Sequence, residues 1–283
     1  MARATPALAA ARPTLPTLEL SGPRLARALE SLVVRSEEYG GVERYVDALK
    51  LKTTLFGQVL GDGRARDVEP KSLRQLLSLL ATVRRRIGPY LHPGRFETLR
   101  ARLAALLDAA RETAAADEAV ATFCGHYPDD REHRFVRDLA VDVLHNVDPE
   151  RYPLMCRWVW DARANTGVLR EIWHADDIDH VQIDVPDRHE TFVVLREELS
   201  QYLTANGVFR DVLQYVDLLT AQVYAEYIAE QGGSYLRADF AMPEDPMLHT
   251  RRMLGLDVAA HGRSRLKAVD GDATIDDAPR LVN

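Results

Sequence analysis

The feature that most constrains this chain is the spacing of its apolar residues, which recur every three or four positions over long stretches. The clearest stretch begins at Pro70, a residue suited to the first position of a helix, and ends at Gly88-Pro89. Its apolar members are Leu73, Leu76, Leu77, Leu80, Val83 and Ile87. Because this period places them on one face of an α-helix, the pattern predicts a helix that buries this face.

The same period predicts helices along most of the chain, with ends marked by glycine pairs, glycine-rich turns or prolines. The expected helices cover about residues 25–39, 42–60, 70–87, 96–107, 129–147, 191–205 and 209–231, with further starts at Pro149 and Pro246. The period fades between Thr166 and Val185. There Val181, Ile183 and Val185 alternate with polar residues, which indicates a short strand or an extended loop.

The pattern therefore predicts a mostly α-helical protein, a helical bundle with one short extended or strand insertion near residues 178–186. We expect a basic N-terminal helical bundle over residues 23–115, packed on an acidic C-terminal helical domain over residues 116–258. The ends, residues 1–22 and 259–283, lack a core-facing period. We interpret both as disordered tails.

Charge is divided unevenly along the 283 residues. Residues 1–112 carry 19 Lys and Arg against 12 Asp and Glu, whereas residues 113–283 carry 17 against 31. Such a division is typical either of a basic face for nucleic acid or of two halves that neutralise each other by packing. We favour packing, because the basic excess is modest for a protein that must neutralise several phosphates.

Composition and motifs exclude several classes. With 46% hydrophobic and 28% charged residues the chain as a whole is not disordered, and no apolar run is long enough to cross a membrane. Neither GxGxxG nor GxxxxGK[ST] occurs, so the sequence gives no nucleotide-binding motif. The two cysteines, Cys124 and Cys156, form no secreted disulfide framework, and we expect a cytoplasmic protein. The apolar neighbours of Cys156 predict a buried, inert thiol.

Residues 124–189 hold six of the nine histidines, all three tryptophans and both cysteines. Within this region an acidic residue precedes a histidine by three positions four times. Two of these pairs, Glu171 with His174 and Asp177 with His180, lie where the helical period breaks. If a turn lets the pairs converge, carboxylates and imidazoles would suit Fe, Mn or Zn, and these four residues are our candidate metal ligands.

The other two acid–histidine pairs fall in residues 130–145, where charged residues share one stripe at helical spacing. The stripe consists of Arg131, Arg134, Asp138, Asp142 and His145. We interpret it as a solvated helix face with ion pairs rather than as a metal site.

Residues 148–160 are a second candidate, because two prolines four positions apart fix the backbone around Arg151 and Tyr152. Arginine and aromatic residues on a stiff backbone are typical of binding hot spots, which makes Arg151, Tyr152, Arg157, Trp158 and Trp160 candidate interaction residues. The alternative is a tight corner whose aromatic rings fill the core. Between Trp158 and Trp160 we expect one buried ring and one at a surface.

The arginines of residues 84–102 form a basic patch on two expected helices. Tyr90 and Phe96 are the only aromatic residues there, which disfavours base stacking and therefore nucleic acid as a partner.

No high-specificity catalytic motif occurs, and the sequence leaves open whether the chain is an enzyme. We expect an accessory or protein-interaction protein that docks another protein or a second copy of itself through arginine and aromatic surfaces, away from membranes. The alternatives are a metal-dependent enzyme or metal-binding protein and a nucleic-acid binder through the arginines at 84–102.

Overall fold

A computed structural model describes residues 15–235 and 247–257 and confirms the mostly helical architecture. The α-helices of these residues are α1 (Gly22–Glu37), α2 (Val42–Leu60), α3 (Pro70–Ser78), α4 (Pro93–Ala109), α5 (Ala116–Gly125), α6 (Phe135–Val147), α7 (Val168–Glu171), α8 (His189–Ala205), α9 (Val212–Tyr235) and α10 (Leu248–Met253). Short 3₁₀ turns lie between several of them. Among the described helices, none is long and apolar enough to cross a membrane.

Glycine and proline set several helix boundaries, as the sequence indicates. Gly41, with φ of 83°, precedes α2, and Gly61 ends it. Pro70 and Pro93 occupy the first positions of α3 and α4, where the absent N–H costs no helical hydrogen bond. The predicted helix over 42–60 is thus confirmed to the residue.

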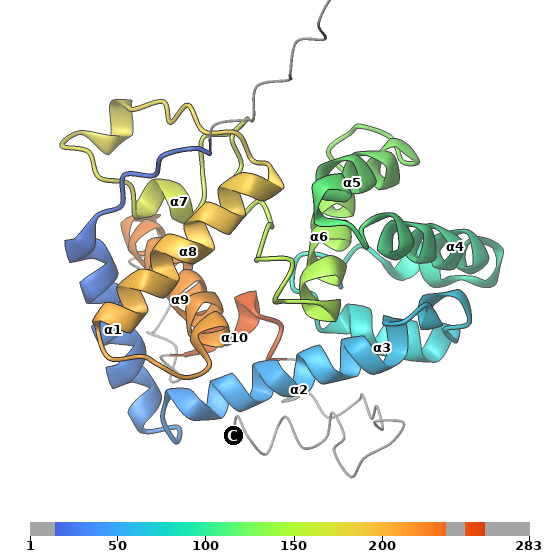
Figure 1. Ribbon diagram of the computed structural model, residues 1–283, viewed down its shortest axis with the longest axis horizontal. Coiled ribbons are helices and arrows are strands. Elements are labelled where there is room, and N and C mark those ends of the chain that lie inside the picture. Colours follow the sequence, from blue (N-terminus) through green and yellow to red (C-terminus); the bar gives the residue numbers. More distant parts are fainter. Residues whose placement is uncertain (1–14, 236–246, 258–283) are drawn as a thin grey trace, which may run out of the picture.

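Two groups of helices share α2, which runs along one edge of the molecule beneath both (Figure 1). In one group α9 contacts α1, α7, α8 and α10; in the other α5 contacts α4 and α6. The centre of α9 is buried around its whole circumference, as expected for a helix enclosed by neighbours, and it includes polar Asp217, Thr220 and Gln222 beside the fully buried Leu218, Leu219 and Ala221.

The basic and acidic halves of the sequence interleave. Helix α1 packs along α9, and α2 packs against both α6 and α9. The halves therefore contact each other over several helices, which fits the packing interpretation of the charge division. The domain boundary expected near residue 115 stays a prediction.

The helix predicted to continue to Ile87 ends at Ser78, because a distant segment interrupts it. Gly255 lies so close to the carbonyl oxygen of Leu79 that a Cβ on it would be 1.7 Å from that oxygen. The N–H of Val83, which a continuing α-helix would direct at Leu79, donates to Leu80 instead. The turns that follow still bury Leu80, Val83 and Ile87. The predicted burial of these residues is therefore confirmed, although they are not part of the helix.

The helix predicted to start at Pro149 does not form. Asp148 accepts the N–H of Arg151 and closes one turn. Pro153 then disfavours helical dihedrals at Tyr152, and an irregular segment follows.

The predicted extended insertion is a loop. Val181 has extended dihedrals, but among the described residues the β-bridges are two isolated ones, Leu20 with Trp173 and Asp161 with Thr166. The tail expected over 1–22 is ordered in its last part, since residues 19–21 pair with residues 172–174. Residues 1–14 and 258–283, which include the other expected tail, lie outside the described residues.

The packing of Gly255 on Leu79 gives a testable prediction. Gly255 has φ of 71°, so Gly255→Ala adds both an unfavourable backbone conformation and a clash with the Leu79 carbonyl. We expect it to lower the free energy of unfolding by more than about 2 kcal/mol in urea denaturation. Gly94→Ala is the matched control, because Gly94 is helical with open space around it and should gain about 0.5–1 kcal/mol. Equal effects of the two variants would contradict this packing.

Candidate functional site

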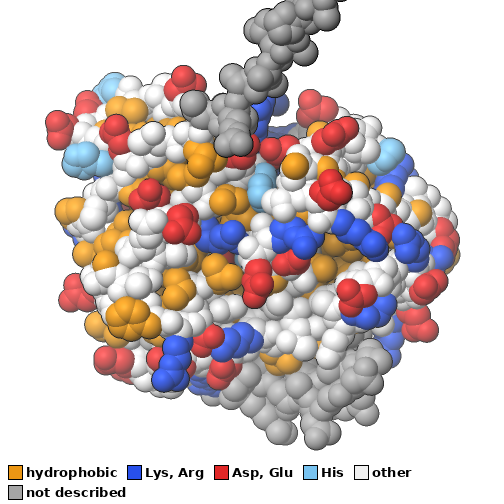
Figure 2. Space-filling view, in the orientation of Figure 1, with side chains coloured by type: hydrophobic (Ala, Val, Ile, Leu, Met, Phe, Trp, Pro, Cys, Tyr) orange, Lys and Arg blue, Asp and Glu red, His pale blue; other side chains and the backbone are white. Residues whose placement is uncertain are grey.

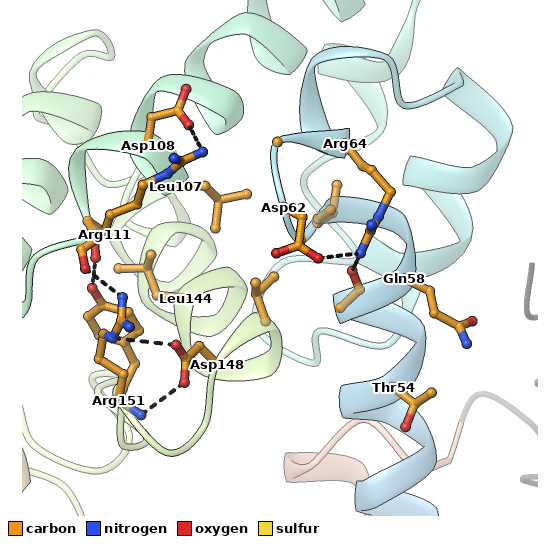
Figure 3. A pocket seen from close by; sticks show the side chains of 17 residues that line it. Thr54, Gln58, Asp62, Arg64, Leu107, Asp108, Arg111, Leu144, Asp148 and Arg151 are labelled. Carbon is orange, nitrogen blue, oxygen red and sulfur yellow. Dashed lines mark hydrogen bonds and ion pairs between the residues drawn. The ribbon is translucent and has the colours of Figure 1, made fainter.

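A pocket of about 830 Å³ lies where the C-terminal ends of α2, α4 and α6 meet (Figure 3). We call it the three-helix pocket. Its floor is apolar and is formed by Leu60, Leu107, Leu144 and Val147, one or two from each helix. Leu60 and Leu144 belong to the buried core, whereas Leu107 and Val147 are partly exposed.

Three Arg–Asp pairs line the pocket, and each pair follows one helix end. The pairs are Asp62 with Arg64 at 3.1 Å, Asp108 with Arg111 at 3.0 Å and Asp148 with Arg151 at 3.5 Å between nitrogen and oxygen. A helix C-terminus carries partial negative charge and carbonyls without helical partners, so it favours arginine nearby.

Two of the arginines donate to backbone carbonyls near these helix ends. Arg64 donates to the carbonyl of Gly57 at 2.7 Å, and Arg151 donates to that of Arg111 at 2.6 Å. Asp108 also pairs with Arg66. The side chains of Arg64, Arg111 and Arg151 nevertheless remain 49%, 65% and 40% exposed. Each guanidinium has five N–H donors, so these contacts leave donors for a ligand.

Of the predicted interaction residues, Arg151 and Tyr152 line this pocket. Tyr152 is buried beneath it, donates its hydroxyl to the carbonyl of Ala110 and packs its ring edge-on against His189. Arg157 lies elsewhere, half-buried and paired with Asp138 at 2.8 Å.

The expectation that only one of Trp158 and Trp160 is buried is wrong. Trp158 is 7% exposed and packs on Tyr224, while Trp160 is fully buried and donates its indole N–H to the carbonyl of Val185 at 2.9 Å. Their segment is covered by neighbouring elements on both sides. The two rings fill the core, as the alternative interpretation had it.

A buried polar network joins α2, α6 and the segment after α6. Lys52 of α2 donates to the carbonyl of Leu254 at 2.8 Å, and Cys156 donates its thiol to Asp142 at 3.0 Å. Burial lowers the pKa of Lys52, although Asp142 nearby opposes this. Burial also raises the pKa of Asp142, with Lys52 opposing, and raises the pKa of Cys156 well above its usual range. A protonated thiol inside the protein is a poor nucleophile, which agrees with the inert cysteine predicted from the sequence.

His145 extends this network to α9. Its Nδ1 lies 2.8 Å from the carbonyl oxygen of Tyr152, and its Nε2 lies 3.2 Å from a carboxylate oxygen of Asp217. Both neighbours offer acceptor oxygens, so this setting favours an imidazolium that donates from both ring nitrogens. Burial alone lowers the pKa of His145, but the attraction and hydrogen bond of Asp217 and the Tyr152 carbonyl together raise it.

The stripe interpreted as a solvated face is therefore partly buried. Asp138, Asp142 and His145 are 3%, 8% and 7% exposed, and each has a partner from another segment. Arg131 and Arg134 remain exposed. The sequence offered no signal for Lys52, Asp217 or Cys156 as partners, since none lies within one turn of the stripe.

The structure does not gather the four candidate metal ligands. Asp177 and His180 form an exposed pair at 2.9 Å. Glu171 ends α7, and the backbone N–H of His174 donates to Glu19. Within the described ranges no group of three or more His, Cys, Asp and Glu side chains is placed to hold a metal ion.

The arginines at 84–102 are largely engaged with protein groups. Arg84 forms two hydrogen bonds with Asp257 at 2.6 and 2.8 Å, and Arg100 pairs with Glu97. Arg95 lies over the ring of Tyr90 and Arg102 over the ring of Tyr127, at 5.8 and 4.7 Å from the centroids.

Comparison of the chain with models of protein families, with curated proteins and with solved structures found no match.

The His145–Asp217 pair predicts a defined pH dependence of stability. Because folding raises the pKa of His145, the pair stabilises the folded state fully below the unfolded histidine pKa of about 6.5. This stabilisation is lost as pH rises through the higher pKa of the folded state. We expect His145→Gln to cost about 3 kcal/mol near pH 6, since it leaves Asp217 buried without a cation, and to cost clearly less near pH 9.

Denaturant unfolding at both pH values measures this difference. His126→Gln is the control, because His126 is exposed and its replacement should change stability by less than about 0.5 kcal/mol at either pH. A cost of His145→Gln that stays constant with pH would show that the imidazolium does not provide the stabilisation.

Proposed function

We propose that this protein is a non-catalytic interaction protein that docks a segment of a partner protein in the three-helix pocket. The observation that carries the proposal is the combination of an apolar floor with three partly exposed Arg–Asp pairs around it. Protein interfaces combine a desolvated apolar centre with a polar rim, and arginine is enriched in them.

Alternating charge around the pocket favours a protein segment over a simple anion. Each arginine has an aspartate of the same turn beside it, so the lining offers no field of a single sign. The wider surface is mixed as well. In Figure 2 basic side chains form a row across the middle of the visible face, with acidic side chains among and beside them.

The exposed fractions of the three arginine side chains indicate which kind of partner segment would fit the pocket. Arg111 is the most exposed of the three arginines, and it shares the carboxylate of Asp108 with Arg66, so one carboxylate serves two guanidinium groups there. A matching segment would place a large apolar side chain on the partly exposed Leu107 and Val147 and a carboxylate beside Arg111.

The buried titratable side chains support a non-catalytic role, because their polar atoms are already engaged with other groups of the protein. His145, Asp142 and Cys156 are buried and are held by one another, by backbone carbonyls or by residues of other helices. We include a cytoplasmic location in the proposal, supported by the two cysteines, which are free thiols.

Selection of peptides from a displayed random library on the immobilised full-length protein tests the proposal. We expect the enriched peptides to share an apolar residue next to an acidic one. Arg111→Glu should weaken their binding at least about tenfold, because it removes a charge-assisted hydrogen bond and adds repulsion. Arg74→Glu is the matched control, since Arg74 is an exposed arginine on α3 outside the pocket, and should leave binding unchanged.

A second variant distinguishes loss of an apolar contact in the pocket from a change of net charge. Leu107→Ala shortens a floor residue without altering net charge and should also weaken the peptides, with the fold checked by circular dichroism. Peptides that bind wild type, Arg111→Glu and Leu107→Ala equally would place docking outside this pocket and refute the proposal.

A further inference from the structure

A second pocket, of about 810 Å³, lies at the N-terminal end of α6. It is enclosed by the turn that precedes α6, the loop around residues 157–164 and Asp187. We call it the arginine pocket, because five of its lining residues are arginines. They are Arg131, Arg134, Arg137, Arg157 and Arg163.

Three of these arginines are oriented by carboxylates. Arg157 pairs with Asp138 at 2.8 Å, Arg137 with Asp187 at 3.4 Å and Arg134 with Asp161 at 3.5 Å. Arg137 also donates to the carbonyls of Met155 and Asp187. Such contacts hold the planar guanidinium in place while leaving some of its N–H donors open.

Arg131 and Arg163 differ from the other three. Both are exposed, and neither makes an ion pair with any residue that the structure describes. They come from two different segments, one before α6 and one in the loop after Trp160, and both line the same pocket.

Among the described residues, the carboxylates of the pocket form no ion pair with these two arginines. Asp161 and Asp187 belong to the pairs above. The carboxylate of Asp130 accepts hydrogen bonds from Nδ1 of His133, at 2.7 Å, and from the backbone N–H of Glu132. The hydrogen bonds of His133 lower the pKa of Asp130, which keeps it charged and engaged. Asp129 and Asp130 are the two lining carboxylates without an arginine partner among the described residues, so they equal Arg131 and Arg163 in number, and the pocket would hold an anion through open guanidinium donors rather than through an excess of positive charge.

Helix α6 adds to the attraction for anions. Its 13 residues begin at Phe135, and no described side chain caps its N-terminus. The first N–H groups of a helix carry partial positive charge, and Arg134, Val136 and Arg137 line the pocket at this end. The N–H of Val136 already donates to the carbonyl of His133 at 2.9 Å, so the arginine side chains supply the donors for an anion.

We infer that the arginine pocket binds the phosphate group of a small phosphorylated ligand, such as a phosphate ester or a pyrophosphate. Arg131 and Arg163 would donate to the phosphate oxygens, for which the guanidinium fork is well matched. The volume is in the range of small-molecule sites. This site is separate from the three-helix pocket, so phosphate binding can be tested independently of the docking function.

The alternative ligand is a nucleic-acid strand, whose backbone phosphates would bind the same arginines. Arg86 donates to the carbonyl of Glu132, which places the turn around Arg85 and Arg86 next to the pocket. A nucleic-acid strand could therefore contact arginines both inside and outside it. The experiment must separate a small phosphorylated ligand from such a strand.

Isothermal titration of the full-length protein with pyrophosphate, inorganic phosphate and a single-stranded oligonucleotide makes this separation. We expect pyrophosphate to bind at one site per chain, with affinity reduced about tenfold by Arg131→Ala and by Arg163→Ala, because each loses a charge-assisted contact. Arg210→Ala is the control, since Arg210 is an exposed loop arginine outside the pocket, and it should bind like wild type.

Each other outcome overturns the inference. Absence of pyrophosphate binding in the folded protein refutes the site, and equal affinity in wild type and both pocket variants shows adventitious binding. An oligonucleotide that binds far more tightly than pyrophosphate, with steep salt dependence and losses from Arg85→Ala as well, would assign the surface to nucleic acid instead.

Discussion

A lysine ammonium inside the protein is the constraint on which much of this structure depends. Lys52 lies on the face of α2 that packs against α6 and α9, and burial lowers its pKa because water is replaced by protein. A buried cation is tolerated only if other groups replace its hydration. Here the ammonium donates a hydrogen bond to the carbonyl of Leu254, and the carboxylates of Asp142 and Asp217 attract it.

These compensating groups come from the parts of the chain that must be brought together. Leu254 belongs to the segment after α10, Asp142 to α6 and Asp217 to α9, and His145 joins α6 to α9 through Asp217. The two groups of helices in Figure 1 therefore meet at a polar network as well as at an apolar core. The same network engages the side chains of Asp142, His145 and Cys156. Helix α6 carries both proposed sites, the arginine pocket at its first turn and the three-helix pocket at its last.

The sequence predicted what local spacing determines. The period of three and four identified α2 and the buried residues of the stretch after Pro70, and the apolar neighbours of Cys156 indicated its burial. It did not predict that Gly255, about 175 positions away, would end α3 at Ser78. It also assigned Asp142 and His145 to a solvated face, because Lys52, Asp217 and Cys156 become their partners only through tertiary packing. Neither pocket was predicted from the sequence, because each combines arginines from turns that are distant in the chain. Three of the lining residues, Arg151, Tyr152 and Arg157, were nevertheless among the candidate interaction residues.

Native-state hydrogen exchange of Lys52→Met compared with wild type tests the central role of the buried lysine most directly. The variant keeps an apolar stem of similar length but leaves Asp142 and the Leu254 carbonyl without the ammonium. We predict that amides of α6 and of residues 247–257 exchange faster together, by at least about tenfold, because both lose the same partner. Lys50→Met, which removes only an exposed pair with Asp211, should leave both regions unchanged. Unchanged exchange in Lys52→Met, or a change limited to the vicinity of residue 52 in α2, would contradict the account.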